Sequence, residues 1–171
     1  MQWHDLWNRQ SQSFSGKRQE TLYYAMLAKD IAALIDDPTA TVLDYGCGSG
    51  ILAIAAARLG ATDVLGVDID PQAVTAARNN AERNGVDVRF DDSAAEIRGQ
   101  FDLVVANILS NPLKALAPAI CSHVRPGGQL ALSGILADQA EELIAAYAPW
   151  VPLAVADTRE GWVCLAGTKP A

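Results

Sequence analysis

The chain has 171 residues, of which 50% are hydrophobic and 19% are charged, and its formal net charge is -7 at pH 7. These values are typical of a single globular domain and disfavour a disordered chain. The acidic balance also disfavours broad binding to nucleic acid, because negative charges repel phosphate backbones. No apolar run approaches the roughly 20 residues that a membrane span needs. The N-terminus lacks the layout of a signal peptide, so we expect a cytoplasmic protein that does not enter the membrane.

The cysteines and histidines are few and scattered. The three cysteines are Cys47, Cys121 and Cys164, and the two histidines are His4 and His123. No CxxC pair occurs, so neither a disulfide framework nor a zinc site is supported. We therefore predict no metal and a reducing environment.

Residues 1–40 differ from the rest of the chain. Residues 10–17 are polar and Ser-rich, as expected for a loop, whereas residues 20–35 place apolar side chains on one helical stripe. Two interpretations stay open for this N-terminal helical segment. It is either an extra helix packed on the sheet or a lid over a ligand. We expect residues 41–171 to form the main domain.

From residue 41 onward, short β-branched or apolar segments alternate with longer helical stretches. The expected strands cover residues 41–45, 64–68, 86–90, 101–106, 129–133, 152–157 and 161–168. The expected helices cover residues 51–59, 71–84, 112–124 and 136–147. Such alternation predicts a parallel sheet with helices on both faces, and the last two strands must pair antiparallel because no crossover joins them. We predict an α/β fold: a doubly wound, mostly parallel seven-stranded sheet with one antiparallel strand at its end, near the C-terminus.

The first expected strand runs into a glycine-rich loop. Its sequence is Asp44-Tyr-Gly46-Cys-Gly48-Ser-Gly50, and a helix is expected to follow. Glycines let the backbone turn tightly and approach a ligand closely. Dinucleotide-binding loops read G-x-G-x-x-G and place pyrophosphate at the helix N-terminus, but here the third glycine comes one position early. The carboxylate of Asp44 would also repel pyrophosphate and attract a cation.

S-adenosylmethionine fits this description, because it has a sulfonium, an ammonium group and no phosphate. D-x-G-x-G-x-G resembles the S-adenosylmethionine-binding signature of class I methyltransferases. The alternatives are a tight turn without a ligand and, more remotely, an NAD-linked oxidoreductase. The predicted cofactor contacts in the loop are Asp44, Gly46, Cys47, Gly48 and Gly50.

Further acids lie at the ends of the next two expected strands. Asp68 lies about 20 residues beyond the loop, where a carboxylate can accept both ribose hydroxyls, and its neighbour Ile69 is predicted to contact the cofactor as well. Asp70 is predicted to cap the following helix. Asp91 or Asp92 could accept a hydrogen bond from the adenine amino group, or both could belong to an ordinary acidic turn. The choice between these two residues stays open.

Together, several ordered motifs resemble the PrmA family, the bacterial ribosomal-protein lysine methyltransferases of class I. The resemblance runs from about residue 41 to 169 and is carried by Asp44–Ala57, Gly66–Ala73, Val105–Leu109, Pro126-Gly-Gly, Leu132–Leu136 and Trp162–Leu165. It implies a Rossmann-like methyltransferase fold, S-adenosylmethionine as cofactor and methyl transfer to an amine of a protein, including a ribosomal protein. Phe14 and Thr21 match positions in the family loop before the catalytic domain, which implies cofactor contacts. The family's N-terminal recognition domain is not expected within residues 1–40.

Asn107 is the predicted catalytic residue and a further cofactor contact. It ends the fourth expected strand, at the rim where the transferred methyl should lie, and its side-chain carbonyl could accept a hydrogen bond from the acceptor N–H. The alternative is a turn residue that closes the strand. Pro112 could line the pocket, and Cys47 is interpreted as a small filler residue rather than a nucleophile.

The favoured function is therefore a methyltransferase that uses S-adenosylmethionine and modifies an amine of a protein. A small-molecule acceptor and a non-catalytic partner subunit that binds S-adenosylmethionine are the alternatives. The sequence leaves the oligomeric state open.

Overall fold

The computed structural model describes residues 29, 31–35, 37 and 39–171. In this part of the chain, seven strands form one sheet in the order β3-β2-β1-β4-β5-β7-β6. The strands are β1 (Thr41–Tyr45), β2 (Asp63–Val67), β3 (Arg89–Asp91), β4 (Phe101–Asn107), β5 (Val124–Leu136), β6 (Ala154–Arg159) and β7 (Trp162–Thr168). The helices are α3 (Ile51–Arg58), α4 (Pro71–Arg83), α5 (Ser110–Ala115), α6 (Ala117–Ser122) and α7 (Ala140–Tyr147), with short 3-10 turns at Ala94–Glu96 and Ala137–Gln139.

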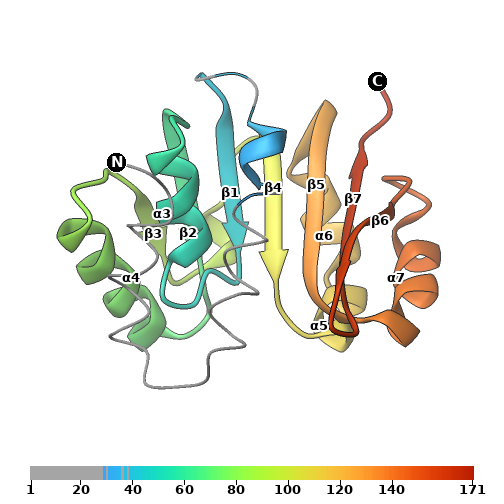
Figure 1. Cartoon of the computed structure of the whole chain (residues 1–171). Helices are drawn as coiled ribbons and strands as arrows, with labels where there is room; N and C mark the ends of the chain where they lie inside the picture. The colour runs from blue at the N-terminus through green and yellow to red at the C-terminus, as the bar shows by residue number, and fades with distance from the viewer. Residues whose placement is uncertain (1–28, 30, 36, 38) are drawn as a thin grey trace.

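The strand directions confirm the predicted fold class. β1 pairs in parallel with β2 and β4, β2 pairs in parallel with β3, and β4 pairs in parallel with β5. β7 pairs antiparallel with both β5 and β6, so it alone runs against the others. The reversed strand lies one place in from the sheet edge rather than at it, because β6 forms the outer strand (Figure 1).

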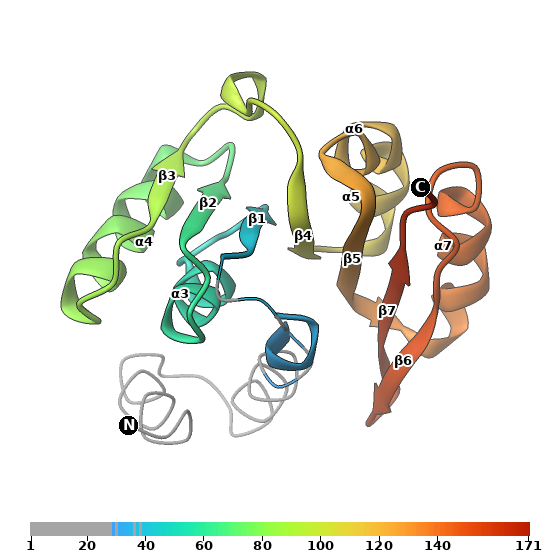
Figure 2. The ribbon, with the colours of Figure 1, turned by 90° about the horizontal axis from the view of Figure 1, so that it is seen from above.

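Helices cover both faces of the sheet, as Figure 2 shows in a view along the strands. Successive residues of β1 point to opposite faces, so Val42 and Leu43 are both fully buried but belong to different cores. Val42 packs with α3, α4 and Ile31, whereas Leu43 packs with α5, α6 and α7. The central strands are therefore buried on both faces, as a parallel sheet requires.

The N-terminal segment is described only near its end. Residues 29 and 31–34 are helical, and Ile31 is fully buried in the core that contains α3 and α4. This agrees with the predicted helix over residues 20–35 where the two can be compared. The remainder of that prediction, and the proposal that residues 1–40 form a lid, lies outside the described residues.

The ends of α4 confirm two local predictions. The side chain of Asp70 accepts a hydrogen bond of 2.9 Å from the Gln72 N–H, which caps the helix, and Pro71 occupies its first turn. Gly85 follows the last turn with a φ of 61°, a conformation that glycine adopts at little cost.

The predicted helix over residues 112–124 is wrong in its continuity, because the structure has two helices that meet at Leu116. Pro118 lies in the first turn of α6 and has no N–H to offer the carbonyl four residues earlier. The buried Tyr147 hydroxyl donates to the Leu113 carbonyl at 2.7 Å and satisfies one acceptor near the break. The predicted strand over residues 129–133 is also too short, since β5 covers Val124–Leu136.

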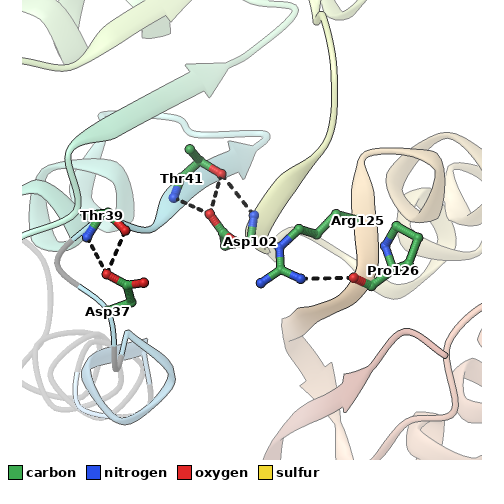
Figure 3. Close-up of polar contacts among 6 residues, drawn as sticks. All are labelled: Asp37, Thr39, Thr41, Asp102, Arg125 and Pro126. Carbon is green, nitrogen blue, oxygen red and sulfur yellow. Dashed lines mark hydrogen bonds and ion pairs between the residues drawn. The ribbon is translucent and has the colours of Figure 1, made fainter. Parts of the chain in front are cut away.

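A carboxylate ties three neighbouring strands together at the end of the sheet where β1 begins (Figure 3). Asp102 Oδ2 accepts from the N–H and the hydroxyl of Thr41, both at 2.8 Å, and Asp102 Oδ1 accepts from Arg125 Nε at 2.5 Å. Partial burial of Asp102 opposes its ionisation, but the bonds from Thr41 and Arg125 outweigh this and lower the pKa of its carboxyl.

In the described part of the chain, no helix combines the length and apolar character that crossing a bilayer requires.

We expect Asp102→Asn to lower the free energy of unfolding by about 1–3 kcal/mol at neutral pH, the scale of lost hydrogen bonds to a charged group. Because the folded pKa is lowered, this contribution is present above the unfolded pKa and is lost as pH falls below about 4. Urea denaturation at pH 7 and pH 3 measures both effects. Asp63→Asn, which breaks the exposed Arg89–Asp63 pair, is the matched control and should cost less than about 1 kcal/mol. Equal losses in the two variants would contradict the prediction.

Candidate functional site

The glycine loop joins β1 to α3 and is held by β2. The N–H groups of Gly46 and Cys47 both donate to the Val67 carbonyl, at 2.8 and 2.9 Å, and Gly50 N–H donates to the Cys47 carbonyl at 2.8 Å. Gly46, Gly48 and Gly50 all have positive φ, between 52° and 84°. Positive φ disfavours residues with a Cβ, which explains why glycines alternate in this turn.

The third glycine, Gly50, is also required by packing against Phe90. A Cβ built on Gly50 would lie 2.9 Å from Phe90 Cζ, and one built on Gly66 of β2 would lie 2.6 Å from the same ring. The Phe90 ring therefore occupies the space that side chains at both positions would need. This contact, together with the positive φ, explains why position 50 is glycine.

The carboxylate of Asp44 is buried directly behind the loop. Asp44 is 1% exposed, and its Oδ2 accepts a hydrogen bond of 3.0 Å from the Ala53 N–H in the first turn of α3. Burial outweighs this bond and, with the nearby Asp68 charge, raises the pKa of Asp44 to about 7. The positive end of α3 thus already has an acidic partner from within the fold.

Asp68 also holds the loop by a hydrogen bond, from the side of β2. Its Oδ2 accepts from Gly48 N–H at 2.8 Å and its Oδ1 accepts from Asp70 N–H at 3.0 Å. Each carboxylate oxygen can accept a further hydrogen bond, so this side chain retains acceptor capacity. The Asp68 N–H donates to the Asp91 carbonyl at 3.1 Å, which links the ends of β2 and β3.

Beside the loop lies a mostly apolar pocket of about 410 Å³. It is lined by Tyr45, Gly46, Val67, Asp68, Ile69, Ala94, Ile108, Leu109, Pro112 and Leu116. These residues come from the carboxyl ends of β1, β2 and β4, from the turn after β3, and from α5 with the residue that follows it. This is where open α/β sheets bind ligands. Among the lining side chains, Asp68 is the acid, so the pocket combines apolar walls with one carboxylate.

Of the residues predicted from the sequence, the structure brings Gly46, Asp68, Ile69 and Pro112 to the pocket wall. Cys47, Gly48 and Gly50 lie in the loop behind it, and Asp44 lies in the interior. Burial, followed by the charges of Asp44 and Asp68, raises the pKa of the Cys47 thiol, which suits a filler residue better than a nucleophile.

The remaining predicted residues lie around this pocket or beyond the described chain. Asn107 ends β4 and is partly buried, directly before the lining residue Ile108. Asp91 Oδ1 accepts from Ser93 N–H at 3.0 Å, whereas Asp92 is exposed. Phe14 and Thr21 lie outside the described residues, so their cofactor contacts stay predictions.

The sequence reasoning missed six of the lining residues: Tyr45, Val67, Ala94, Ile108, Leu109 and Leu116. Five of them could have been found from the rule that ligands lie beyond the carboxyl ends of the strands, because they end or follow β1, β2, β3 and β4. Leu116 lies at the junction of α5 and α6, away from the strand ends, so that rule does not reach it.

The strand order, the single reversed strand and the pocket beyond the glycine loop define the Rossmann-like fold of class I methyltransferases. The ribosomal protein L11 methylase of Lactobacillus delbrueckii subsp. bulgaricus is similar with a TM-score of 0.79 and 38% identity, over 91% of this chain and 82% of that one. An RNA methyltransferase from Salinibacter ruber, solved in complex with S-adenosyl-L-homocysteine, is similar with a TM-score of 0.66 and 26% identity, over 84% and 90% of the two chains.

The sequence comparisons narrow this class to one family. The family described as ribosomal protein L11 methyltransferase (PrmA) matches residues 26–170. The ribosomal protein L11 methyltransferase of Dechloromonas aromatica is 75% identical over 130 residues, 76% of this chain and 44% of the relative. That of Cupriavidus metallidurans is 62% identical over 131 residues, 77% and 43% of the two chains. The chain belongs to the PrmA family, as its motifs suggested, and spans less than half the length of these curated relatives.

The burial of Asp44 makes a testable contribution to stability. Its folded pKa, about 7, lies above its unfolded value, so the folded state binds more protons between about pH 4 and pH 7. The stability of the chain relative to Asp44→Asn should therefore fall as pH rises through this window and level off above it. Urea denaturation at several pH values measures the difference.

The exposed variant Asp87→Asn gives the baseline for removing one acid from this acidic chain. Stability curves for Asp44→Asn and the unmodified chain that run parallel between pH 4 and pH 7 would show that Asp44 is not held in this buried state.

Proposed function

We propose that the protein transfers a methyl group from S-adenosylmethionine to an amine of a protein, and that ribosomal protein L11 is the acceptor. The relatives named ribosomal protein L11 methyltransferase in Dechloromonas and Cupriavidus are 75% and 62% identical to the chain. The Salinibacter methyltransferase, which shares the fold at 26% identity, was solved with the demethylated product of the same cofactor. Family membership thus supports the reaction, and the site supports the choice of cofactor.

The observation that carries the choice of cofactor is the bond between Asp44 and the Ala53 N–H. Dinucleotide-binding loops direct such N–H groups at a pyrophosphate. Here one of them is bonded to a buried carboxylate 3.0 Å away. An acid bonded to this N–H removes a donor that a phosphate would use, and the Asp68 carboxylate at the pocket wall favours a ligand that carries positive charge.

The pocket offers groups that suit a nucleoside. We assign the ribose hydroxyls to Asp68, whose two oxygens each keep acceptor capacity beyond their bonds to Gly48 and Asp70. Ile69, which is 88% exposed, and Ala94 provide apolar surface for a base. Asp91 or Asp92 is assigned to the adenine amino group, since Asp91 ends β3 and Asp92 follows it, shortly before Ala94.

S-adenosylmethionine, when bound, supplies a methyl group that its sulfonium has already activated. The residues of the chain then have to align the acceptor and keep its amine neutral, because only a neutral amine offers a lone pair. The apolar wall of Ile108, Leu109 and Pro112 lowers the pKa of an amine brought against it by desolvation. We assign to the Asn107 carboxamide the role of accepting a hydrogen bond from the acceptor N–H and orienting the lone pair. Such alignment alone can lower a barrier by about 7–11 kcal/mol.

Two measurements test the function directly. Calorimetry should show binding of S-adenosylmethionine and of S-adenosylhomocysteine, and no heat with NAD. Incubation with methyl-labelled S-adenosylmethionine and purified ribosomal protein L11 should place label in the protein fraction. Binding of NAD in place of S-adenosylmethionine would overturn the cofactor assignment, whereas binding of S-adenosylmethionine without label in the purified ribosomal protein L11 would overturn the acceptor.

We expect Asp68→Ala to weaken the binding of S-adenosylmethionine by about 1–3 kcal/mol, or roughly 5- to 150-fold, because hydrogen bonds to a charged group are lost. Asp68→Asn keeps an acceptor oxygen, so its affinity for S-adenosylmethionine should lie between that of the unmodified chain and that of Asp68→Ala. Calorimetry measures the affinity, and Asp87→Ala, an exposed acid remote from the pocket lining, is the control. An unchanged affinity in Asp68→Ala would remove this residue from the site.

We expect Asn107→Ala to lower kcat by about tenfold or more while the affinity for S-adenosylmethionine stays within about threefold, since alignment rather than binding is lost. Label transfer to ribosomal protein L11 measures kcat. Asn79→Ala, an exposed asparagine on α4, is the matched control. Turnover equal to that of the unmodified chain would return Asn107 to a structural role.

A further inference from the structure

The segment Asn107–Ile108 lies in a slot between two glycines: Gly46, which follows β1, and Gly134 of β5, the strands on either side of β4. On one side, a Cβ built on Gly46 would lie 2.7 Å from Ile108 Cγ2. On the other side, a Cβ built on Gly134 would lie 2.6 Å from the Ile108 carbonyl oxygen and 3.0 Å from Asn107 Oδ1. Real Cβ atoms essentially never lie less than 3.0 Å from such atoms, so the contacts with Ile108 require glycine at both walls of the slot, and the contact with Asn107 would be tight.

Gly134 lies at a β-bulge in β5. Between the pairs Leu132–Leu165 and Ile135–Val163, β5 contains one residue more than β7. Ser133 and Gly134 lie opposite the single residue Cys164 of β7, and Gly134 has a φ of 81°. Bulges of this kind bend the strand and re-aim neighbouring side chains, often beside active sites.

The bulge lies next to Asn107. Ser133 is the parallel partner of Asn107 in the β4–β5 ladder, so the residue after it passes directly beside the end of β4. At this point the backbone of β5 approaches the side chain and the following carbonyl of β4 without a Cβ between them. The backbone of a different strand therefore borders the carboxamide directly.

From this geometry we infer that Gly134 is a positioning residue for Asn107: its missing side chain gives the carboxamide and the Asn107–Ile108 peptide the place from which Asn107 orients the acceptor amine. The inference rests on the proposed function for the role of Asn107, but the slot itself does not. A methyl group at position 134 would push against a backbone oxygen, which cannot rotate away as the end of a flexible side chain can. Because misplacement by about 1 Å can cost about a hundredfold in rate, such a shift should be felt in turnover.

A matched glycine separates the contact from backbone strain. Gly99 also has a φ of 81°, but a Cβ built on it has nothing within 4 Å. Gly99→Ala therefore places an alanine at the same positive φ as Gly134→Ala does, without the contact with Asn107 and Ile108. A difference in behaviour between Gly99→Ala and Gly134→Ala therefore measures the effect of the contact with Asn107 and Ile108.

The first test needs no ligand. In ¹⁵N-labelled protein, the side-chain amide signals of Asn107, identified by their loss in Asn107→Ala, should shift in Gly134→Ala and stay in place in Gly99→Ala. In the unmodified chain, the same amide should be as rigid in relaxation measurements as the backbone, unlike that of the exposed Asn79. This last comparison decides the question even if Gly134→Ala does not fold. Unshifted signals, or an Asn107 amide as mobile as that of Asn79, would overturn the inference.

The second test uses label transfer to ribosomal protein L11. Gly134→Ala should lower kcat by about tenfold or more and keep the affinity for S-adenosylmethionine within about threefold. Gly99→Ala should leave both kcat and this affinity unchanged. In the double variant Asn107→Ala/Gly134→Ala, kcat should equal that of Asn107→Ala alone, because residues that act through one group are not additive. Additive losses would show that Gly134 acts on something other than Asn107.

The two proposals fail in distinguishable ways. Normal turnover in Asn107→Ala removes the proposed role of Asn107, and absence of label transfer in the unmodified chain removes the proposed function. A tenfold loss in Asn107→Ala together with equal kcat in Gly134→Ala and Gly99→Ala overturns the positioning role alone.

Discussion

The carboxylate of Asp44, enclosed by the end of β1 and the first turn of α3, is the constraint on which the geometry of the site depends. A buried acid is costly unless it is neutral or hydrogen-bonded, and the Ala53 N–H supplies that bond. The bond fixes the start of α3 relative to β1, so the five residues between them must turn within a short distance. Three positive φ angles make this turn, which is why glycines occupy it.

Asp68 completes the same arrangement from the side of the pocket. Asp44 lies in β1, whereas Asp68 directly follows β2. The Asp68 side chain accepts a hydrogen bond from the Gly48 N–H at the middle of the loop. The loop thus has one acid behind it, closed off from solvent, and one acid at the pocket wall. Both acids hold backbone N–H groups, Asp44 that of Ala53 and Asp68 that of Gly48. An acidic site of this kind favours a positively charged ligand over a phosphate.

The end of β4 is held as closely as the loop, but by shape and not by charge. Gly46 and Gly134 leave a slot for Asn107 and Ile108, so the β1 loop, β4 and β5 meet within van der Waals distance. This links the place proposed for the cofactor to the residue proposed to orient the acceptor. Tightly packed backbone transmits small displacements, and the alignment of the two reactants therefore depends on a bulge in β5.

Several features were predictable because their causes are local. The cap at Asp70 needs only a short polar side chain and the N–H two residues later. The strands and helices follow from alternating patterns, and the reversed strand follows from the short link between β6 and β7. Of the candidate site, Gly46, Asp68, Ile69 and Pro112 were found at the pocket wall. The break at Leu116 was missed because the helical pattern continues across Pro118 and outweighed the missing N–H.

By itself, the sequence determined the class of fold, the family and the position of the loop, since these depend on patterning and on the order of residues along the chain. The tertiary structure decided which atoms each acid reaches: Asp44 turns inward to Ala53, and Asp68 faces the pocket. It also decided the slot around Asn107, because the contact of Gly134 with that residue joins positions that only the pairing of β4 with β5 brings together. Close approach between backbones of different strands leaves no local pattern, and so it could be known only from the folded chain.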